Sequence, residues 1–257
     1  MGEELKDKVA VVTGATSGIG RATALRFAEE GATLVLVGRS REGLSKISAE
    51  ICAGGGEAFA VVADVTVEAD AERVVRETID DFGRLDVLVN AAGILSTGTV
   101  EDTTLAAWDA MMNVNLRSVF QLMQLAVPHL ERSRGSVVNV SSVTGLRAFP
   151  GVLAYCVSKA AVDQLTRCAA LELAAKGVRV NAVNPGVVRT EIHRRGGMDE
   201  EAYETFLERS KATHPLGRVG DAREVAELIL FLASERAAWI TGATYSIDGG
   251  RAQTCAR

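Results

Sequence analysis

Short apolar runs alternate along the chain with longer segments in which apolar and polar residues are mixed. Continuous Val-rich runs suit strands that are buried on both faces, as in a parallel sheet covered by helices. Seven runs predict β-strands at residues 9–12, 33–37, 58–62, 87–89, 137–140, 178–183 and 245–247. The regular alternation of strand and helix predicts a doubly wound α/β fold with helices on both faces of the sheet.

The helices between these strands have recognisable ends. Helices predicted at residues 19–30 and 68–82 are each followed by a glycine, which often closes a helix in the left-handed conformation. Asp221, with Glu224 three positions later, predicts a capping box at the start of a further helix. Pro128 is expected to end or kink the helix that contains it.

Composition and charge argue against several classes of protein. The 33 acidic and 28 basic residues are interleaved, the net charge is −5, and no basic block indicates a nucleic-acid partner. The first residues are charged and no apolar run is long enough to span a membrane, so we expect neither a signal peptide nor a transmembrane helix. One domain over residues 1–257 is expected, in the cytoplasm. The cysteines have no metal-ligand spacing, so we predict reduced, buried thiols and no metal site: Cys52, Cys156, Cys168 and Cys255.

The first predicted strand runs directly into a glycine-rich turn and then a helix. Such a turn tolerates positive φ and brings the backbone close to a pyrophosphate at the helix N-terminus. Its position between the first strand and first helix favours a dinucleotide site over a turn without a ligand. The expected fold is thus Rossmann-type, with a sheet of about seven strands. The residues of the turn expected to bind the cofactor are Gly14, Thr16, Ser17, Gly18, Ile19 and Gly20.

The end of the second strand predicts which dinucleotide is preferred. An acidic residue there would bind the adenosine ribose of NAD(H), but this chain has Gly38 followed by Arg39. Arg39 offers a bidentate partner for a 2′-phosphate, and Ser40 adds a hydroxyl. We therefore predict NADP(H) over NAD(H).

Tyr155 and Lys159 are four residues apart and lie on one face of a helix. A phenol is a poor acid–base catalyst at neutral pH, and a neighbouring ammonium is expected to lower its pKa. This spacing alone is common by chance. Two further features support a site: Ser142 at the end of a predicted strand, where a doubly wound fold presents its site, and Asn115 in an otherwise apolar helix. A serine hydrolase is rejected because the chain has no GxSxG elbow and no histidine beside a nucleophile.

These residues resemble the classical short-chain dehydrogenase/reductase family across essentially the whole chain. Further matching motifs are Asp64 after the third strand, 90–93 after the fourth, and 184–186. The resemblance implies an oxidoreductase that interconverts a ketone and a secondary alcohol by hydride transfer. Tyr155 would donate the proton to the carbonyl oxygen and Ser142 would orient that oxygen. Lys159 would hold the nicotinamide ribose and tune Tyr155, and Asn115 would anchor a water in the proton relay.

The resemblance also implies further contacts with the cofactor. Asp64 and Val65 would contact the adenine, Asn90, Ala91 and Gly93 the ribose region, and Pro185, Gly186, Val188 and Thr190 the nicotinamide carboxamide. Ala91 departs from the family's usual Asn, which puts local rigidity in doubt rather than activity.

Within the family, the pattern is most similar to 3-oxoacyl-thioester reductase-like members. Substrate choice in such enzymes lies in the segment at about 188–216, which here contains five basic or imidazole side chains but also four glutamates. An anionic or phosphopantetheine-linked substrate is one interpretation, and a mobile, solvated lid is the more probable one. The basic and imidazole residues are His193, Arg194, Arg195, Lys211 and His214.

The helix that contains Leu116, Phe120 and Met123 is apolar on more than one face. This predicts a homo-oligomer, in line with the tetramers of dihedral symmetry that the family commonly forms. Three alternatives to an NADP(H)-dependent reductase remain open. The first is the same chemistry with NAD(H), the second is a non-catalytic dinucleotide-binding sensor, and the third is an isomerase or epimerase that retains its cofactor.

Overall fold

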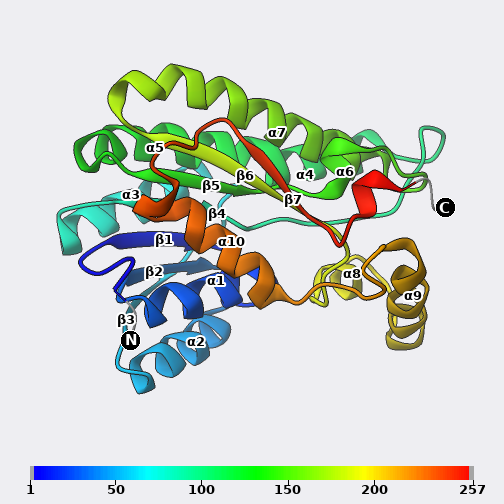
Figure 1. Ribbon diagram of the computed structural model, residues 1–257, viewed down its shortest axis with the longest axis horizontal. Helices are drawn as coiled ribbons and strands as arrows, with labels where there is room; N and C mark the ends of the chain where they lie inside the picture. Colours follow the sequence, from blue (N-terminus) through cyan, green and yellow to red (C-terminus); the bar gives the residue numbers. More distant parts are fainter. Residues whose placement is uncertain (1–2, 255–257) are drawn as a thin grey trace.

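The computed structural model describes residues 3–254, and its centre is one seven-stranded parallel sheet (Figure 1). The strand order is β3-β2-β1-β4-β5-β6-β7. The order reverses between β1 and β4, which makes this a doubly wound sheet. The strands are β1 Val9–Thr13, β2 Thr33–Gly38, β3 Glu57–Val62, β4 Val87–Asn90, β5 Ser136–Val140, β6 Arg179–Pro185 and β7 Thr244–Ile247.

Helices cover both faces of this sheet, α5 and α7 on one side and α1, α2 and α10 on the other (Figure 1). Alternate residues of each strand serve the two cores: Ala10 and Val12 face one, Val9 and Val11 the other. The helices are α1 Gly18–Glu29, α2 Arg41–Ala53, α3 Glu68–Phe82, α4 Leu105–Met112, α5 Ser118–Ser133, α6 Val143–Leu146, α7 Leu153–Leu173, α8 Ile192–Arg195, α9 Glu200–Thr213 and α10 Ala222–Ala233.

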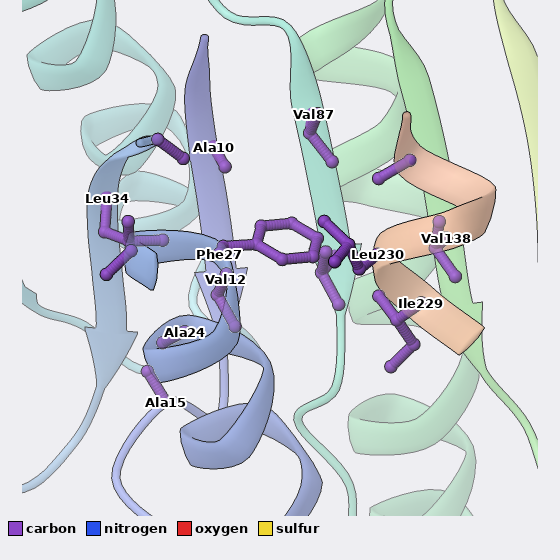
Figure 2. Close-up of a cluster of buried hydrophobic side chains, with 14 of the residues drawn as sticks. Ala10, Val12, Ala15, Ala24, Phe27, Leu34, Val87, Val138, Ile229 and Leu230 are labelled. Atoms are coloured by element: carbon purple, nitrogen blue, oxygen red, sulfur yellow. The ribbon is translucent and has the colours of Figure 1, made fainter. Parts of the chain in front are cut away.

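One core brings α1 and α10 together over the middle of the sheet. Figure 2 shows Phe27 of α1 pointing toward Leu230 of α10, above side chains of the central strands. Phe27 is fully buried. Burying an aromatic ring of this size stabilises the fold by about 1.5–3 kcal/mol. This packing holds the last turn of α1 against α10 and the sheet.

The predicted elements agree with the structure in type and nearly in extent. Gly83 closes α3 in the left-handed conformation, with φ of 70°. Asp221 and Glu224 form the predicted capping box of α10. The doubly wound α/β fold with seven strands is confirmed.

One expectation about the fold is wrong. Not every strand is buried on both faces: β3 and β7 are the outer strands, and Phe59 of β3 is 36% exposed. Pro128, expected to end or kink its helix, does not end it, since α5 continues to Ser133. Proline removes one N–H of the helix, and the burial of Ala126 and Leu130 on either side holds the chain helical.

Candidate active site

The turn between β1 and α1 is closed by contacts of the protein with itself. Gly14 has φ of 66°, and a Cβ there would come within 2.9 Å of the Ala92 nitrogen. Gly20, in the first turn of α1, lies against the same residue: its Cβ would be 2.5 Å from the Gly14 oxygen. These two glycines are therefore required by the turn itself, before any cofactor is considered.

The surroundings of this turn fit a dinucleotide. Ser17 caps the start of α1 without a side-chain hydrogen bond, which leaves the helix N–H groups directed at the turn. A Cβ at Gly18 would meet the Thr190 side chain at 3.1 Å, and one at Gly93 would lie 3.7 Å from Lys159 Nζ. Three loops that carry predicted cofactor residues thus meet at the carboxyl edge of the sheet, with glycines keeping the space between them open.

The predicted 2′-phosphate site lies at the end of β2. Thr16 packs against it, since a Cβ at Gly38 would be 3.1 Å from Thr16 Cγ2. Arg39 is exposed, and the Ser40 hydroxyl accepts a hydrogen bond from Gly43 N at 3.1 Å as the cap of α2. This bond leaves the Ser40 proton free to donate to an anion.

The end of β3 holds Asp64 and Val65, the residues expected at the adenine. The Asp64 Oδ1 atom accepts hydrogen bonds from the Thr66 N–H and hydroxyl, which lower the pKa of Asp64. The positive charge of Arg39 lowers it to a lesser extent. Val65 is buried.

Tyr155 and Lys159 lie on one face of α7, with Lys159 Nζ 5.7 Å from the centre of the phenol ring. Lys159 donates to the Val140 carbonyl at 2.8 Å, which uses one of its three N–H groups. Ser142 follows β5, and its hydroxyl accepts from Thr144 N at 3.1 Å. Its proton is thereby free, and Ser142 hydrogen-bonds the Tyr155 side chain.

The electrostatics of the pair differ from the sequence-based expectation. Burial raises the pKa of Tyr155 to about 12, although the hydrogen bond from Ser142 works to lower it. Burial also lowers the pKa of Lys159 to about 8. In the chain by itself, desolvation of both groups is therefore the larger effect. The expected lowering of the phenol pKa by the lysine together with an oxidised nicotinamide stays a prediction.

Asn115 is fully buried in a π-helical turn, Asn113–Arg117, that joins α4 to α5. Its Oδ1 accepts from Ile94 N at 2.8 Å, and its amide nitrogen donates to Ile94 O at 2.9 Å and Ser158 Oγ at 3.1 Å. Both amide hydrogens are thus used within the protein. The side chain of Asn115 therefore has no hydrogen left for a water.

Thr13 is a site residue that was not among the predicted ones. Its hydroxyl accepts from the N–H groups of Ala91 at 3.0 Å and Ala92 at 3.1 Å. These bonds hold the loop after β4 against the end of β1. Asn90 instead donates to Asn139 Oδ1 at 2.9 Å within the sheet, and its own oxygen lacks a partner among the described residues.

The loop after β6 is held by two side chains from α9 and its end. Tyr203 is fully buried, and its hydroxyl accepts from Thr190 N at 3.0 Å and donates to Thr190 O at 2.9 Å. His214 Nε2 accepts from Val187 N at 3.1 Å, and Nδ1 donates to Ser210 O at 2.7 Å. His214 is therefore a neutral, structural residue. The sequence pattern of this segment, which is mostly polar, did not indicate that Tyr203 and His214 hold the loop.

The position of the loop itself is tightly constrained. A Cβ at Gly186 would be 2.8 Å from His214 Nε2, so Pro185–Gly186 passes directly over the imidazole. Val188 is buried and pairs with Gly220 as an isolated bridge. Thr190 lies against Gly18 of the glycine turn. The predicted contacts of Val188 and Thr190 with the cofactor stay predictions.

The segment 188–216, interpreted from its sequence as a mobile, solvated lid, forms α8 and α9. Tyr203 and Leu207 of this segment are buried, while most of its residues are exposed or half-buried. Its cations do not form a free cluster: Arg194 pairs with Glu191 and Glu200, and Lys211 pairs with Glu208. The apolar face of α9 was masked in the sequence by its many charges.

The cysteines of residues 3–254 are not paired in disulfides. Cys52 and Cys168 are exposed and Cys156 is half-buried, all three as free thiols, so the expectation of buried thiols is wrong. Cys255 lies outside the described residues. Within this part of the chain, no helix has the length and hydropathy needed to cross a bilayer.

Comparison with known proteins identifies relatives over nearly the whole chain. The family model described as enoyl-(acyl carrier protein) reductase matches residues 14–252. The chain is 43% identical to a 3-oxoacyl-acyl-carrier-protein reductase of Thermotoga maritima, over 96% of this chain and 98% of that protein. It is 38% identical to meso-2,3-butanediol dehydrogenase of Serratia marcescens, over 95% and 94% of the two chains.

Solved structures agree with these relatives. A short-chain dehydrogenase/reductase of unknown function from Caenorhabditis elegans, solved with cofactor, superposes with a TM-score of 0.93 at 37% identity. The superposition covers 98% of this chain and 97% of that one. The chain therefore belongs to the short-chain dehydrogenase/reductase family, whose members are oxidoreductases of CH–OH and C=O groups that use a nicotinamide dinucleotide.

Proposed function

We propose that the chain is an NADP(H)-dependent oxidoreductase that interconverts a ketone and a secondary alcohol, with Tyr155 as the general acid and base. The observation that carries this proposal is the meeting of three groups at the carboxyl edge of the sheet. The Ser142 hydroxyl hydrogen-bonds the Tyr155 phenol, and Lys159 lies on the same face of α7 beside Gly93.

The polypeptide's part in the reaction is to hold the substrate oxygen and supply its proton. The Ser142 hydroxyl, which faces the Tyr155 phenol in the chain by itself, turns its proton to the carbonyl oxygen of a bound substrate as charge builds on that oxygen. Tyr155 gives its phenolic proton to that oxygen, an assignment that its high pKa supports because the phenol stays protonated at neutral pH. The nicotinamide, when bound, supplies the hydride that adds to the carbonyl carbon.

Lys159 and Asn115 have supporting roles in this proposal. Two N–H groups of Lys159 remain for the hydroxyls of the nicotinamide ribose, since only one is given to Val140. The backbone carbonyl of Asn115 holds a water that returns a proton to Tyr155 by way of Lys159. The glycine turn receives the pyrophosphate, and Asp64, Val65, Asn90 and Gly93 surround the adenosine half.

The preference for NADP(H) rests on the end of β2. Gly38 removes the carboxylate that would repel a 2′-phosphate, and the exposed Arg39 and the free Ser40 proton are available to it. The relatives' substrates include acyl-carrier-protein thioesters and a small diol by their names, so a ketone or β-ketoacyl thioester is the proposed substrate class.

The experiment is a panel of ketones, 3-oxoacyl thioesters, steroids and sugars, followed by NADPH absorbance. Tyr155→Phe should lower kcat by about 10²- to 10⁴-fold, which is the usual contribution of a general acid. Tyr245→Phe also removes one phenol hydroxyl and should leave the rate unchanged. Retained turnover in Tyr155→Phe would contradict the mechanism. NADPH binding without consumption of any substrate would favour a sensor.

We also propose that the chain forms a homo-oligomer through α4 and α5. Phe120 is 48% exposed, and it borders a surface hollow of about 500 Å³ that Met112, Leu116 and Leu165 also line. An apolar hollow with an exposed ring beside it suits a self-complementary contact with a second copy. The remaining lining residues are Asp109, Asn113 and Arg117.

A further inference from the structure

A buried carboxyl group lies behind the proposed catalytic residues and has no part in the mechanism above. Asp163 is fully buried on α7, one turn after Lys159 and two turns after Tyr155, and thus on the same face of the helix. Among residues 3–254, no ion pair reaches its carboxyl group. A buried carboxylate without an ion pair is costly, so its hydrogen bonds decide in which form it is held.

The first partner of Asp163 comes from the end of β6. Asn184 Nδ2 lies 2.9 and 3.1 Å from the two carboxyl oxygens of Asp163 and 3.0 Å from the carbonyl oxygen of Ser142. The amide has two hydrogens, so one is given to the Asp163 carboxyl and the other to the Ser142 backbone. Asn184 thereby ties Asp163 to the segment that presents the Ser142 hydroxyl.

Ser141, the residue before Ser142, gives its hydroxyl proton to the Lys159 carbonyl oxygen at 3.1 Å. A hydroxyl has one proton to donate. Among the described residues, the donor within hydrogen-bond distance of the Asp163 carboxyl is therefore the Asn184 amide. One neutral N–H does not offset the burial of a full negative charge.

The surroundings leave little room for water to take these roles. A Cβ on Gly145 would be 2.9 Å from Lys159 O and closer still to Asp163 Oδ2, so α6 rests directly on α7 at this point. Burial raises the pKa of the Asp163 carboxyl against the opposing effects of Ser141 and Asn184. The charges that act on it are Arg167 and Lys159, both on α7 itself, and both lower its pKa.

We propose that Asp163 is held as a neutral carboxylic acid and is a positioning residue for the carbonyl site. Its carboxyl oxygens accept from Asn184, whose amide also holds the Ser142 carbonyl oxygen, and Ser141 bonds the Lys159 carbonyl oxygen; together these contacts fix the backbone of Ser142 against the turn of α7 that carries Lys159. The effect on turnover rests on the proposed function, whereas the protonation state of Asp163 does not.

Two substitutions separate this role from that of a buried charge. Asp163→Asn keeps one donor and one acceptor in the same shape, and should therefore keep most of the activity. Asp163→Ala removes both, and should lower kcat about tenfold to a hundredfold through misplacement of Ser142, with little change in the KM for NADPH. Glu172→Gln makes the same carboxyl-to-amide change on the exposed side of α7 and is the matched control.

A readout independent of turnover is the infrared spectrum of the folded protein at neutral pH. The wild-type protein and Glu172→Gln should both show the C=O stretch of a protonated carboxylic acid, and Asp163→Asn should lack it. This result would support the protonation state even if no ketone were reduced. The absence of that band from the wild-type protein would overturn the proposal. So would loss of activity in Asp163→Asn equal to that in Asp163→Ala, or a wild-type kcat in Asp163→Ala.

Discussion

Gly20→Ala tests whether the glycine turn is shaped by the protein or by its cofactor. The added Cβ would lie 2.5 Å from the Gly14 oxygen, and ordinary van der Waals contact begins at 3.4 Å. The start of α1 must therefore move away from the turn by about 0.9 Å. Because the opposing atoms are backbone, no flexible side chain can yield instead.

The expected changes in unfolding free energy and in NADPH affinity follow from two opposing effects on stability and one effect on binding. Overpacking of this kind costs about 1–3 kcal/mol, while alanine gains up to about 1 kcal/mol over glycine as a helix former. The net loss of unfolding free energy should thus be no more than about 2 kcal/mol. A shift of the helix N–H groups away from the pyrophosphate would lose charge-assisted hydrogen bonds, each worth about 1.5–3 kcal/mol. The Kd for NADPH should therefore rise by at least about tenfold.

The assay is NADPH binding followed by fluorescence, together with denaturant unfolding of each variant. Gly83→Ala is the control, because Gly83 has φ of 70° and nothing within 4 Å of its Cβ position. It should cost about 1–2 kcal/mol of stability through the left-handed backbone alone and leave NADPH binding intact. A wild-type Kd for Gly20→Ala would refute the reasoning.

Other predictions concern the cofactor, pH, the β6 loop and assembly. Arg39→Ala should raise the KM for NADPH about tenfold to a hundredfold and leave that for NADH unchanged, since one charged hydrogen bond is worth about 1.5–3 kcal/mol; an equal effect of Arg76→Ala, on exposed α3 surface, would contradict this. Because the pKa of Lys159 is about 8, its ammonium is present below that pH, and kcat/KM for ketone reduction should fall as pH rises through about 8. A flat profile across this range would rule out a required ammonium. His214→Ala leaves the Val187 N–H without its partner, and should lower the free energy of unfolding by about 1–3 kcal/mol in denaturant titrations. Phe120→Glu should produce a smaller species in sedimentation, and an unchanged oligomer would place the contact elsewhere.

Much of the fold could be predicted because it depends on local pattern. Apolar runs of strand length, and helices that end at a glycine or begin with a capping box, depend on residues that are close in the sequence. All seven strands appear where they were expected. The exposure of β3 could not be predicted in this way. It depends on strand order, which places β3 at the edge of the sheet.

In the candidate site, too, the features that depend on local sequence could be predicted and those that depend on tertiary packing could not. The residue types of Tyr155, Lys159 and Ser142 could be found from spacing and from their place after strands. The pKa of Tyr155 could not, because it is governed by burial beneath segments far away in the sequence. The same holds for His214 and Tyr203, whose partners become visible only when α9 packs beneath the loop after β6.

Because Tyr203 and His214 hold the loop after β6, most of the segment at 191–213 can be exchanged for that of another protein. Tyr203 grips Thr190 and His214 grips Val187, so the loop that faces the cofactor is held by side chains on one surface of α9. The remaining surface of α8 and α9 is then free to vary without disturbing the loop. A chimaera that takes residues 191–213 from a relative with another substrate should therefore keep its cofactor site, provided that Tyr203 and Ser210 are restored beneath it.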